Sequence, residues 1–338
     1  MRITQIEIKF LFIKSFKKLR MKLRLKYLVL FSVIIGNCFY SFSQKFTIPI
    51  FPDTQVEVGS KPEMFYSQIN WIVKHKDSLN IPMALHVGDL VNFNNFNHFE
   101  VASKGYEAFD KAHIPYAITL GNHDGEAVGY HSGSAAPGNV NQNLRKTFKF
   151  NSYFPVSRFT SQRGRFEPGK SDNAYYTFKV GNTNWLVIAL EFCPRMGAIN
   201  WAADIAKEYF NYNAIILTHS YLTGKGEISR SNSGYGDFSP QDIFNKVVKT
   251  NPNVRYVFSG HVGTSALKID TAQDGHKVYQ ILQDYQGEDS GGGYLRLLTF
   301  DIDKGTISAK MYSPYYNVTK KDYSQFEIKG VDFLKIDD

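Results

Sequence analysis

Three apolar runs, each followed by polar residues, constrain most strongly how this chain of 338 residues can fold. The runs cover residues 46–51, 81–87 and 114–120, and segments with apolar residues at helical spacing, 61–79 and 97–112, separate them. This alternation predicts parallel strands joined by crossover helices. The carboxyl ends of parallel strands meet at one edge of a sheet, where open α/β proteins bind their ligands.

Each of these runs ends in side chains that can bind a cation or transfer a proton. Asp53 and Gln55 follow the first run, Asp89 follows the second, and the sequence Gly-Asn-His-Asp at residues 121–124 follows the third. Each group alone has an ordinary explanation, because Gly, Asn and Asp are also the common turn residues. Three such groups in succession, all at strand ends, favour a functional site.

The second half of the chain adds two more strand ends of the same kind. Two predicted strands end at His219 and His261, and a single histidine of this sort would more often be a core or surface residue. The other predicted elements are a hairpin at 175–180 and 185–190, a helix at 198–209, strands at 214–217 and 254–258, loops at 125–140 and 221–238, a helix beginning at Ser239 and a strand-rich part at 264–313.

Together the five strand ends suggest a metal centre. Imidazole and carboxylate ligands suit divalent transition metals, and one carboxylate can bridge two of them. Two cations about 3.5–4 Å apart can hold a hydroxide and both ends of an in-line phosphoryl displacement. The chemistry that this pattern favours is therefore hydrolysis of a phosphate ester.

In these five blocks the chain resembles the calcineurin-like metallophosphoesterases. The family pattern is D-x-H, G-D, G-N-H-[DE], a lone His after a strand, and G-H-x-H, and residues 45–265 carry it in the same order. The resemblance implies an α/β fold, a two-sheet β-sandwich flanked by helices in αββα layers, with a dinuclear site at one end. It also implies that Asp89 bridges two metals, that Asp53 binds the first, and that Asn122, His219 and His261 bind the second.

The sequence departs from the family pattern twice, both times at the first metal. Gln55 stands where the family usually has His, and Gly263 stands where it usually has a second His. We expect two divalent ions drawn from Mn, Mg, Zn, Fe or Ca, the first bound more weakly. An oxygen-rich first site, with the amide of Gln55 as a ligand, favours Mg²⁺, Mn²⁺ or Ca²⁺ over Zn²⁺.

Catalytic roles fall on the histidine beside this centre. The resemblance implies that His123, held by Asp124, protonates the leaving oxygen or stabilises phosphoryl charge while a hydroxide held by the metals attacks phosphorus. Arg195 follows a strand end and could clamp a phosphate, although surface arginines are common. His131 lies in the predicted loop 125–140 and could reach substrate, although a solvated loop residue is the alternative.

The N-terminal part has the pattern of an export signal. Residues 1–26 carry nine Lys or Arg and one acidic residue, an apolar run at 27–35 follows, and cleavage after Ser43 would make Gln44 the new N-terminus. Translation could also start at Met21. An uncleaved anchor is the alternative, but the apolar run is short for a span. Attachment of a lipid at Cys38 is disfavoured because Asn precedes that cysteine.

Removal of residues 1–43 changes the charge balance. Lys plus Arg falls from 39 to 30 and Asp plus Glu from 31 to 30, so residues 44–338 are formally neutral and have no basic surface typical of nucleic-acid binding. No linker, repeat or disulfide framework is evident, and we expect one exported domain over 44–338, periplasmic or secreted, without a membrane span. The oligomeric state is left open.

Two functions from different classes fit this sequence. The first is an exported hydrolase of phosphate diesters or monoesters. The second is a non-catalytic, metal-stabilised binding module whose first metal site has degenerated. The carboxylate of Asp53 beside Asp89 favours the hydrolase, because a binding module needs no second metal-binding carboxylate there.

Overall fold

A computed structural model of the chain describes residues 20–22 and 44–336. Residues from Gln44 onward form one compact unit. The predicted cleavage site, the apolar run and Cys38 lie outside the described residues. Among the residues that are described, no helix is both long enough and apolar enough to cross a lipid bilayer.

One sheet contains the three strands predicted in the first half of the chain. The strands β1, β2 and β3 pair in parallel, with Ile50 opposite Leu85 and His86 opposite Ile118. C-terminal strands extend this sheet on the other side of β1, in the order β13-β12-β11-β1-β2-β3, with β14 paired to β12. The strand bounds are β1 (Lys45–Phe51), β2 (Ala84–His86), β3 (Tyr116–Ile118), β11 (Leu295–Asp301), β12 (Thr306–Ser313), β13 (Val318–Thr319) and β14 (Phe326–Lys329).

The second sheet has the order β4-β5-β6-β7-β8-β10-β9. Its central strands β6, β7, β8 and β10 run parallel to one another, whereas β5 pairs with β6 and β9 pairs with β10 in antiparallel orientation. The bounds are β4 (Gln162–Arg165), β5 (Ala174–Val180), β6 (Thr183–Leu190), β7 (Asn213–Thr218), β8 (Val254–Ser259), β9 (Ser265–Thr271) and β10 (Lys277–Gln283). The predicted hairpin at 175–190 is confirmed, and β9 and β10 lie in the predicted strand-rich part.

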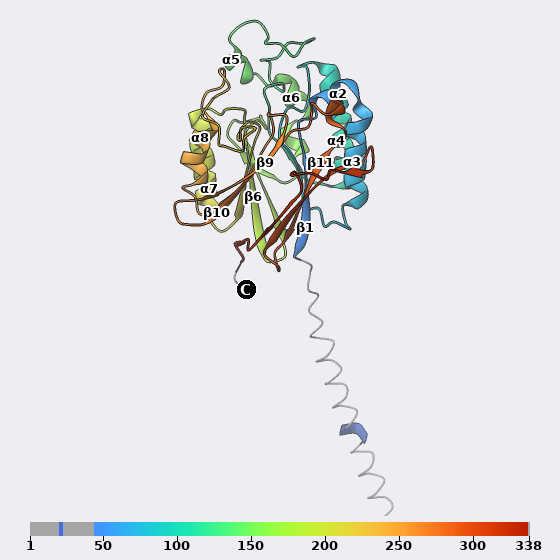
Figure 1. Cartoon of the computed structure of the whole chain (residues 1–338), viewed down its shortest axis with the longest axis vertical. Coiled ribbons are helices and arrows are strands. Elements are labelled where there is room, and N and C mark those ends of the chain that lie inside the picture. Colours follow the sequence, from blue (N-terminus) through green and yellow to red (C-terminus); the bar gives the residue numbers. More distant parts are fainter. Residues whose placement is uncertain (1–19, 23–43, 337–338) are drawn as a thin grey trace, which may run out of the picture. The chain divides into compact units, whose positions relative to one another are not determined.

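Helices cover the outer face of each sheet, so the layers follow the predicted αββα order (Figure 1). α3 and α4 lie on the first sheet, and α7 and α8 on the second. The helical bounds are α2 (Gln55–Ser60), α3 (Pro62–His75), α4 (Phe96–Ala112), α5 (Val140–Leu144), α6 (Phe148–Tyr153), η1 (Val156–Arg158), α7 (Met196–Glu208), α8 (Pro240–Ile243), the π-helical turn η2 (Phe244–Val248) and η3 (Asp289–Gly291). The predicted two-sheet sandwich is confirmed.

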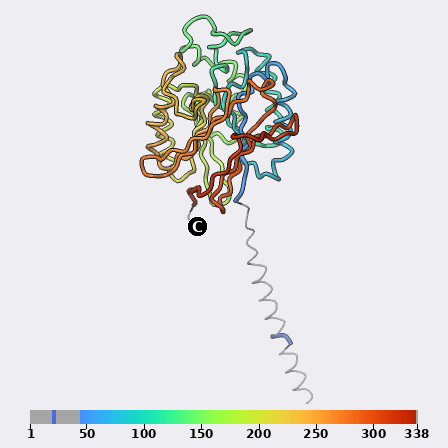
Figure 2. Tube along the Cα trace, viewed as in Figure 1, coloured from blue at the N-terminus to red at the C-terminus, as the bar shows by residue number. Residues whose placement is uncertain are grey.

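Aromatic rings join the two sheets across the core. The buried Trp185 of β6 lies with its ring centroid 5.1 Å from that of Phe46 in β1 and 5.0 Å from that of Phe300 in β11. Tracing the chain shows the C-terminal strands returning to lie beside β1 (Figure 2). The first and last thirds of the folded unit therefore share one core, as a single domain would require.

Prolines shorten two of the predicted strands. The runs 81–87 and 114–120 form strands at Ala84–His86 and Tyr116–Ile118, and Pro82 and Pro115, which have no N–H to donate, account for the late start of each strand. Ser239 begins a helix with the expected capping box. The short helices α2, α5 and α6 were not predicted, since segments of five or six residues show no clear helical period.

Candidate metal centre

The predicted strand ends meet at one edge of the sandwich. Asp53 follows β1 and Asp89 follows β2, while His219 follows β7 and His261 follows β8. Ligand atoms of Asp89, His219 and His261 all lie within 4.8 Å of one another. The first sheet supplies the carboxylates and the second sheet supplies the imidazoles, so the cluster spans both sheets.

His219 is oriented to offer one ring nitrogen to the cluster. Its Nδ1 lies 2.8 Å from the carbonyl oxygen of Val87, and because a carbonyl oxygen only accepts, Nδ1 carries the hydrogen. Nε2 then faces the site, 3.3 Å from Asp89 Oδ2 and 3.2 Å from Nδ1 of His261. A carbonyl that fixes the tautomer in this way is the usual support of a metal-binding histidine.

The ionisable side chains Asp53, Asp89 and His219 are buried. Burial opposes protonation of His219, but the carboxylates of Asp89 and Asp53 outweigh it and raise its pKa to about 10. Burial and the neighbouring His219 lower the pKa of His261 to about 4. Burial and the nearby Asp284 raise the pKa of Asp53 well above its usual range. In the metal-free protein these shifts favour protons on His219 and on Asp53, and a divalent ion would displace them.

Two amide oxygens in the site have no hydrogen-bond partner. Both Asn122 Oδ1 and Gln55 Oε1 are buried atoms left without a donor. An unpaired buried acceptor is unfavourable, and a cation is the partner that would satisfy both. The residues that the sequence analysis selected therefore fit divalent metal ions, with imidazole nitrogens on one side and oxygens on the other.

Glycines allow the backbone to approach the two carboxylates. A Cβ on Gly121 would lie 2.0 Å from Asp89 Oδ1, and a Cβ on Gly260 would lie 2.0 Å from Asp53 Oδ1. Asp89 and His261 themselves adopt positive φ, at 50° and 76°. Non-glycine residues in this conformation are uncommon and concentrate at functional sites, so the local backbone is shaped around the cluster.

The structure corrects the predicted support of His123. Asp124 was predicted to hold this imidazole, but Nδ1 of His123 lies 2.7 Å from the carbonyl oxygen of Asn92. The carboxylate of Asp124 instead accepts the backbone N–H groups of Gly121 and Val91. Burial raises the pKa of Asp124 to about 7, with Asp89 adding to the effect. Asp124 therefore holds the backbone of the loops around Gly121 and Val91. The contact of His123 Nδ1 with Asn92 leaves the other ring nitrogen, Nε2, on the opposite side of the ring.

Arg195 is not available as the predicted phosphate clamp. Its Nε donates to Glu191 at 2.9 Å, and its Nη2 donates to Glu167 at 2.5 Å and to Glu191 at 2.9 Å. The guanidinium also lies over the ring of Phe166. Because two carboxylates already occupy this fork, Arg195 positions the start of α7 and is not part of the candidate site.

His131 belongs to the exposed loop that the sequence analysis expected there. Its ring packs edge-on against Tyr130 with centroids 4.6 Å apart. The loop nevertheless approaches the site, since a Cβ on Gly133 would lie 3.4 Å from Cε1 of His123. The segment before α5 lies at the end of the sandwich to which β1 runs (Figure 1).

Sequence reasoning missed three residues at this site. Asn92 was overlooked because its contribution is a backbone carbonyl, which no side-chain pattern reveals. Tyr235 in the glycine-rich loop 221–238 stacks on Phe192, whose ring in turn contacts the rings of His219 and His261. Asp284 follows β10 directly and is fully buried, and its position after a strand was the one usable sign.

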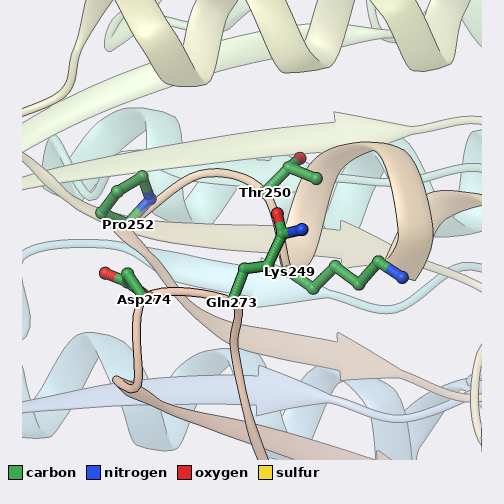
Figure 3. A pocket seen from close by; sticks show the side chains of 5 residues that line it. All are labelled: Lys249, Thr250, Pro252, Gln273 and Asp274. Carbon is green, nitrogen blue, oxygen red and sulfur yellow. The ribbon is translucent and has the colours of Figure 1, made fainter.

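An open pocket elsewhere is remote from this cluster. Its lining residues precede β8 or form the turn between β9 and β10, whereas the cluster lies after β8 (Figure 3). The residues are Lys249, Thr250, Pro252, Gln273 and Asp274. Opposite ends of one strand cannot share a site, so this pocket plays no part in the arrangement described above.

Comparisons with known proteins agree with the fold and the strand-end blocks. A curated protein of Bacillus subtilis (strain 168), "Uncharacterized protein YvnB", is 31% identical over 308 residues, covering 88% of this chain and 22% of that protein. The chain therefore spans about a fifth of that relative's length. The solved purple acid phosphatase PPD1 from yellow lupin (Lupinus luteus) seeds has a similar fold, with a TM-score of 0.52 at 14% identity over 85% of this chain and 54% of the other.

The family is shown by the sequence itself. Residues 47–264 match the family described as calcineurin-like phosphoesterase, and this segment contains all five strand-end blocks. The resemblance inferred from those blocks is confirmed, and the divalent metal ions that the family implies have a candidate site in Asp89, His219 and His261. This chain belongs to the calcineurin-like phosphoesterase family.

Proposed function

We propose that this protein is an exported, metal-dependent hydrolase of phosphate esters. The observation that carries the proposal is the meeting of Asp53, Asp89, Asn122, His219 and His261 at one edge of the sandwich, with the amide oxygen of Asn122 unpaired. A phosphate ester is the substrate class that suits such a set, because paired divalent cations stabilise both the entering and the leaving oxygen of an in-line displacement.

The protein residues would hold two cations side by side. Asn122, His219 and His261 would bind one of them, Asp53 and Gln55 would bind the other, and Asp89 would bridge the pair. When bound, such ions supply positive charge to the phosphoryl oxygens and lower the pKa of water. The hydrogen on Nδ1 of His219 points away from the site, so Nε2 needs no rearrangement to bind.

His123 would serve as the proton donor to the leaving oxygen. Nδ1 of His123 lies 2.7 Å from the carbonyl oxygen of Asn92, to which it donates. The backbone N–H of His123 donates to Asp89 Oδ1 at 2.9 Å. These two contacts fix the ring relative to the bridging carboxylate and leave Nε2 to donate or accept a proton. A positioned imidazole of this kind contributes about 10²–10⁴-fold to a rate.

A turnover assay on the purified protein tests this proposal. After chelation, Mn²⁺, Mg²⁺, Ca²⁺ or Zn²⁺ is added back and hydrolysis of an aryl phosphate diester and an aryl phosphate monoester is measured. We expect metal-dependent turnover that Asp89→Asn abolishes, and the preferred ester would identify the substrate class. Absence of turnover with every metal and both esters would contradict the hydrolase.

The binding-module alternative rests on the two departures at the first metal, Gln55 and Gly263. It predicts about one bound metal ion per chain and no turnover of either ester. In the relative from Bacillus subtilis the matching segment is only part of a much longer protein, so a domain of this kind could also act beside others.

Export is tested separately, through the mature N-terminus. Mass spectrometry of the protein recovered from its native host should find a chain that starts at Gln44, in the periplasm or the medium. A lipid on Cys38 would instead indicate attachment to the envelope, and an intact N-terminus would indicate an uncleaved anchor.

A further inference from the structure

Gly263, at the position of the family's second histidine, lies next to the buried carboxylate of Asp284. Gly263 stands where the family usually has that histidine, and its backbone N–H donates to Asp284. Asp284 follows the last residue of β10, and its own N–H donates to the carbonyl oxygen of Thr264 at 2.9 Å. Because β10 runs parallel to β8, its carboxyl end comes to the same edge as His261.

Asp284 lies within electrostatic reach of the metal centre. It is fully buried, and its charge acts on Asp53, Asp89 and His219. Within residues 46–336, no lysine or arginine forms an ion pair with Asp53, Asp89 or Asp284, and His219 is the cationic group that faces the first two. Burial raises the pKa of Asp53 and of Asp284, so these acids favour their protonated forms, and a divalent ion would stabilise the ionised carboxylates instead.

Gln55 connects Asp284 to the predicted first metal site. The Nε2 of Gln55 donates to Oε1 of Gln286, and the Nε2 of Gln286 lies 3.4 Å from Asp284 Oδ2. Gln55 is 4% exposed, and its Oε1 has no hydrogen-bond partner. Gln55 follows Asp53 by two residues, and an unpaired, buried amide oxygen at this position is an independent sign of a missing cation.

We propose that Asp284 replaces the absent histidine as a ligand of the first metal. With Asp53, Gln55 and the shared Asp89, it would complete a site made of oxygen atoms alone. Such a site selects a hard cation such as Mn²⁺ or Mg²⁺ over Zn²⁺. This assignment rests on the two-metal centre of the proposed function, and it explains how the centre can remain complete although both first-site histidines are absent.

Metal stoichiometry tests the assignment without relying on activity. Metal-free full-length wild type, Asp284→Asn and Asp172→Asn are dialysed against Mn²⁺, and bound Mn²⁺ is counted by elemental analysis. Asp172 is the matched control, a buried carboxylate that bonds Thr147 and Asn151 away from the cluster. Paramagnetic resonance of the same samples reports whether two Mn²⁺ ions lie side by side.

We expect two Mn²⁺ per chain and a coupled pair in the wild type and in Asp172→Asn. Asp284→Asn should hold one ion, with binding of the other weakened by about 100-fold or more, since lost support of a ligand alone weakens metal binding by about 10–100-fold. Two ions bound to Asp284→Asn with wild-type affinity would overturn the assignment, as would a wild type that holds only one.

A rescue variant keeps the test decisive. No atom lies within 4 Å of a Cβ built on Gly263, so a side chain can enter there. Asp284→Asn combined with Gly263→His should regain the second ion and prefer Zn²⁺ more than the wild type does. Should Asp284→Asn fail to fold, anomalous diffraction from Mn²⁺-loaded wild-type crystals decides. A Mn²⁺ within about 2.6 Å of an Asp284 oxygen would support the assignment, and the absence of one would overturn it.

Failure of this assignment differs from failure of the proposed function. A wild type that binds two Mn²⁺ through Asp284 but hydrolyses no phosphate ester would contradict the function alone. An Asp284→Asn variant with two ions and full turnover would contradict the assignment alone.

Discussion

His219 shows how single residues at this site serve both folding and chemistry. Its Nδ1–H is bonded to Val87, and its Nε2 lies 3.3 Å from Asp89 and 3.9 Å from Asp53. The ring is fully buried, and the neighbouring carboxylates raise its pKa to about 10, which favours the protonated ring when no metal is bound. The same geometry presents an unhindered nitrogen to a cation once that proton leaves.

His123→Gln should separate catalysis from metal binding. The imidazole is held by Asn92 and is not one of the three residues that form the metal cluster. We expect kcat to fall by about 10²–10⁴-fold, as for the loss of a general acid, while the number of bound metal ions stays unchanged. Turnover measured beside elemental analysis checks this. Loss of metal together with activity would mean that His123 binds metal rather than protons.

Gly121→Ala should disrupt the centre although it adds a single methyl group. The new Cβ would lie 2.0 Å from Asp89 Oδ1 and 2.3 Å from its backbone nitrogen, so Asp89 must move. We expect unfolding free energy to fall by about 1–3 kcal/mol and metal binding to weaken. Gly263→Ala is the matched control, because its Cβ meets nothing within 4 Å. Equal effects of the two substitutions in thermal unfolding and metal titration would contradict this account.

The sequence predicted the three residues whose ligand atoms meet, Asp89, His219 and His261, and also Asp53, which lies 3.9 Å from His219. Asp53, Gln55, Asp89, Asn122, His219 and His261 were selected because each follows an apolar run, and parallel strands bring such positions together. The support of His123 was wrong, since proximity in sequence suggested Asp124 and the fold brought Asn92 instead. Arg195 was misjudged because the sequence does not show that Glu191 and Glu167 surround it.

Among the elements, β10 explains why Asp284 was overlooked. The sequence predicts β9 and β10 only as parts of the strand-rich segment 264–313, which does not say which strands lie on either side of β10. In the structure β10 also pairs in parallel with β8, with Ile281 opposite Phe258. This pairing joins residues distant in the chain and carries the end of β10 to the metal centre.

The short helix α2 contains a buried acid, Glu57, whose titration should affect stability. Glu57 accepts the backbone N–H of Gly293 at 3.1 Å, but its Oε2 has no partner, and burial raises its pKa to about 8. The folded state thus binds this proton more tightly than the unfolded state does. Stability should therefore fall as pH rises from about 4.5 towards 8, by roughly 1.4 kcal/mol for each unit of pKa shift.

Glu57→Gln should remove that loss, since the amide resembles the protonated acid. In thermal unfolding with a chelator present, the variant should exceed the wild type in Tm at pH 8.5 and match it near pH 4.5. A difference of the same size at both pH values would show that packing, rather than ionisation, distinguishes the two proteins.

For the whole molecule, the candidate metal centre would link the two sheets. The first sheet contributes Asp53, Asp89 and Asn122, and the second contributes His219, His261 and Asp284. The aromatic core around Trp185 joins the sheets in their interior, while at this edge charged groups face one another and repel unless a cation is present.

Removing the metal should therefore lower the stability of the entire domain. A ligand at 100 times its Kd stabilises a protein by about 2.7 kcal/mol, so chelation should lower Tm by about 5 °C or more. Calorimetry with and without Mn²⁺ measures this shift. In Asp89→Asn, which lacks the predicted bridging carboxylate, neither chelation nor added Mn²⁺ should change Tm much. An unchanged wild-type Tm would contradict a link between the sheets.

The layered architecture was predictable as a whole because alternating strands and helices admit few arrangements. The C-terminal strands β13 and β14, of two and four residues, could not be predicted, because segments so short show no periodicity that distinguishes them from loops.

The most direct test of the central claim is turnover measured while Mn²⁺ is added in equivalents to the metal-free wild type. We expect hydrolysis of the preferred phosphate ester to stay low after one equivalent and to rise steeply up to the second, because both ions flank the reacting phosphorus. A protein that binds two equivalents and still hydrolyses neither a diester nor a monoester would contradict the claim that these strand ends form a hydrolytic metal centre.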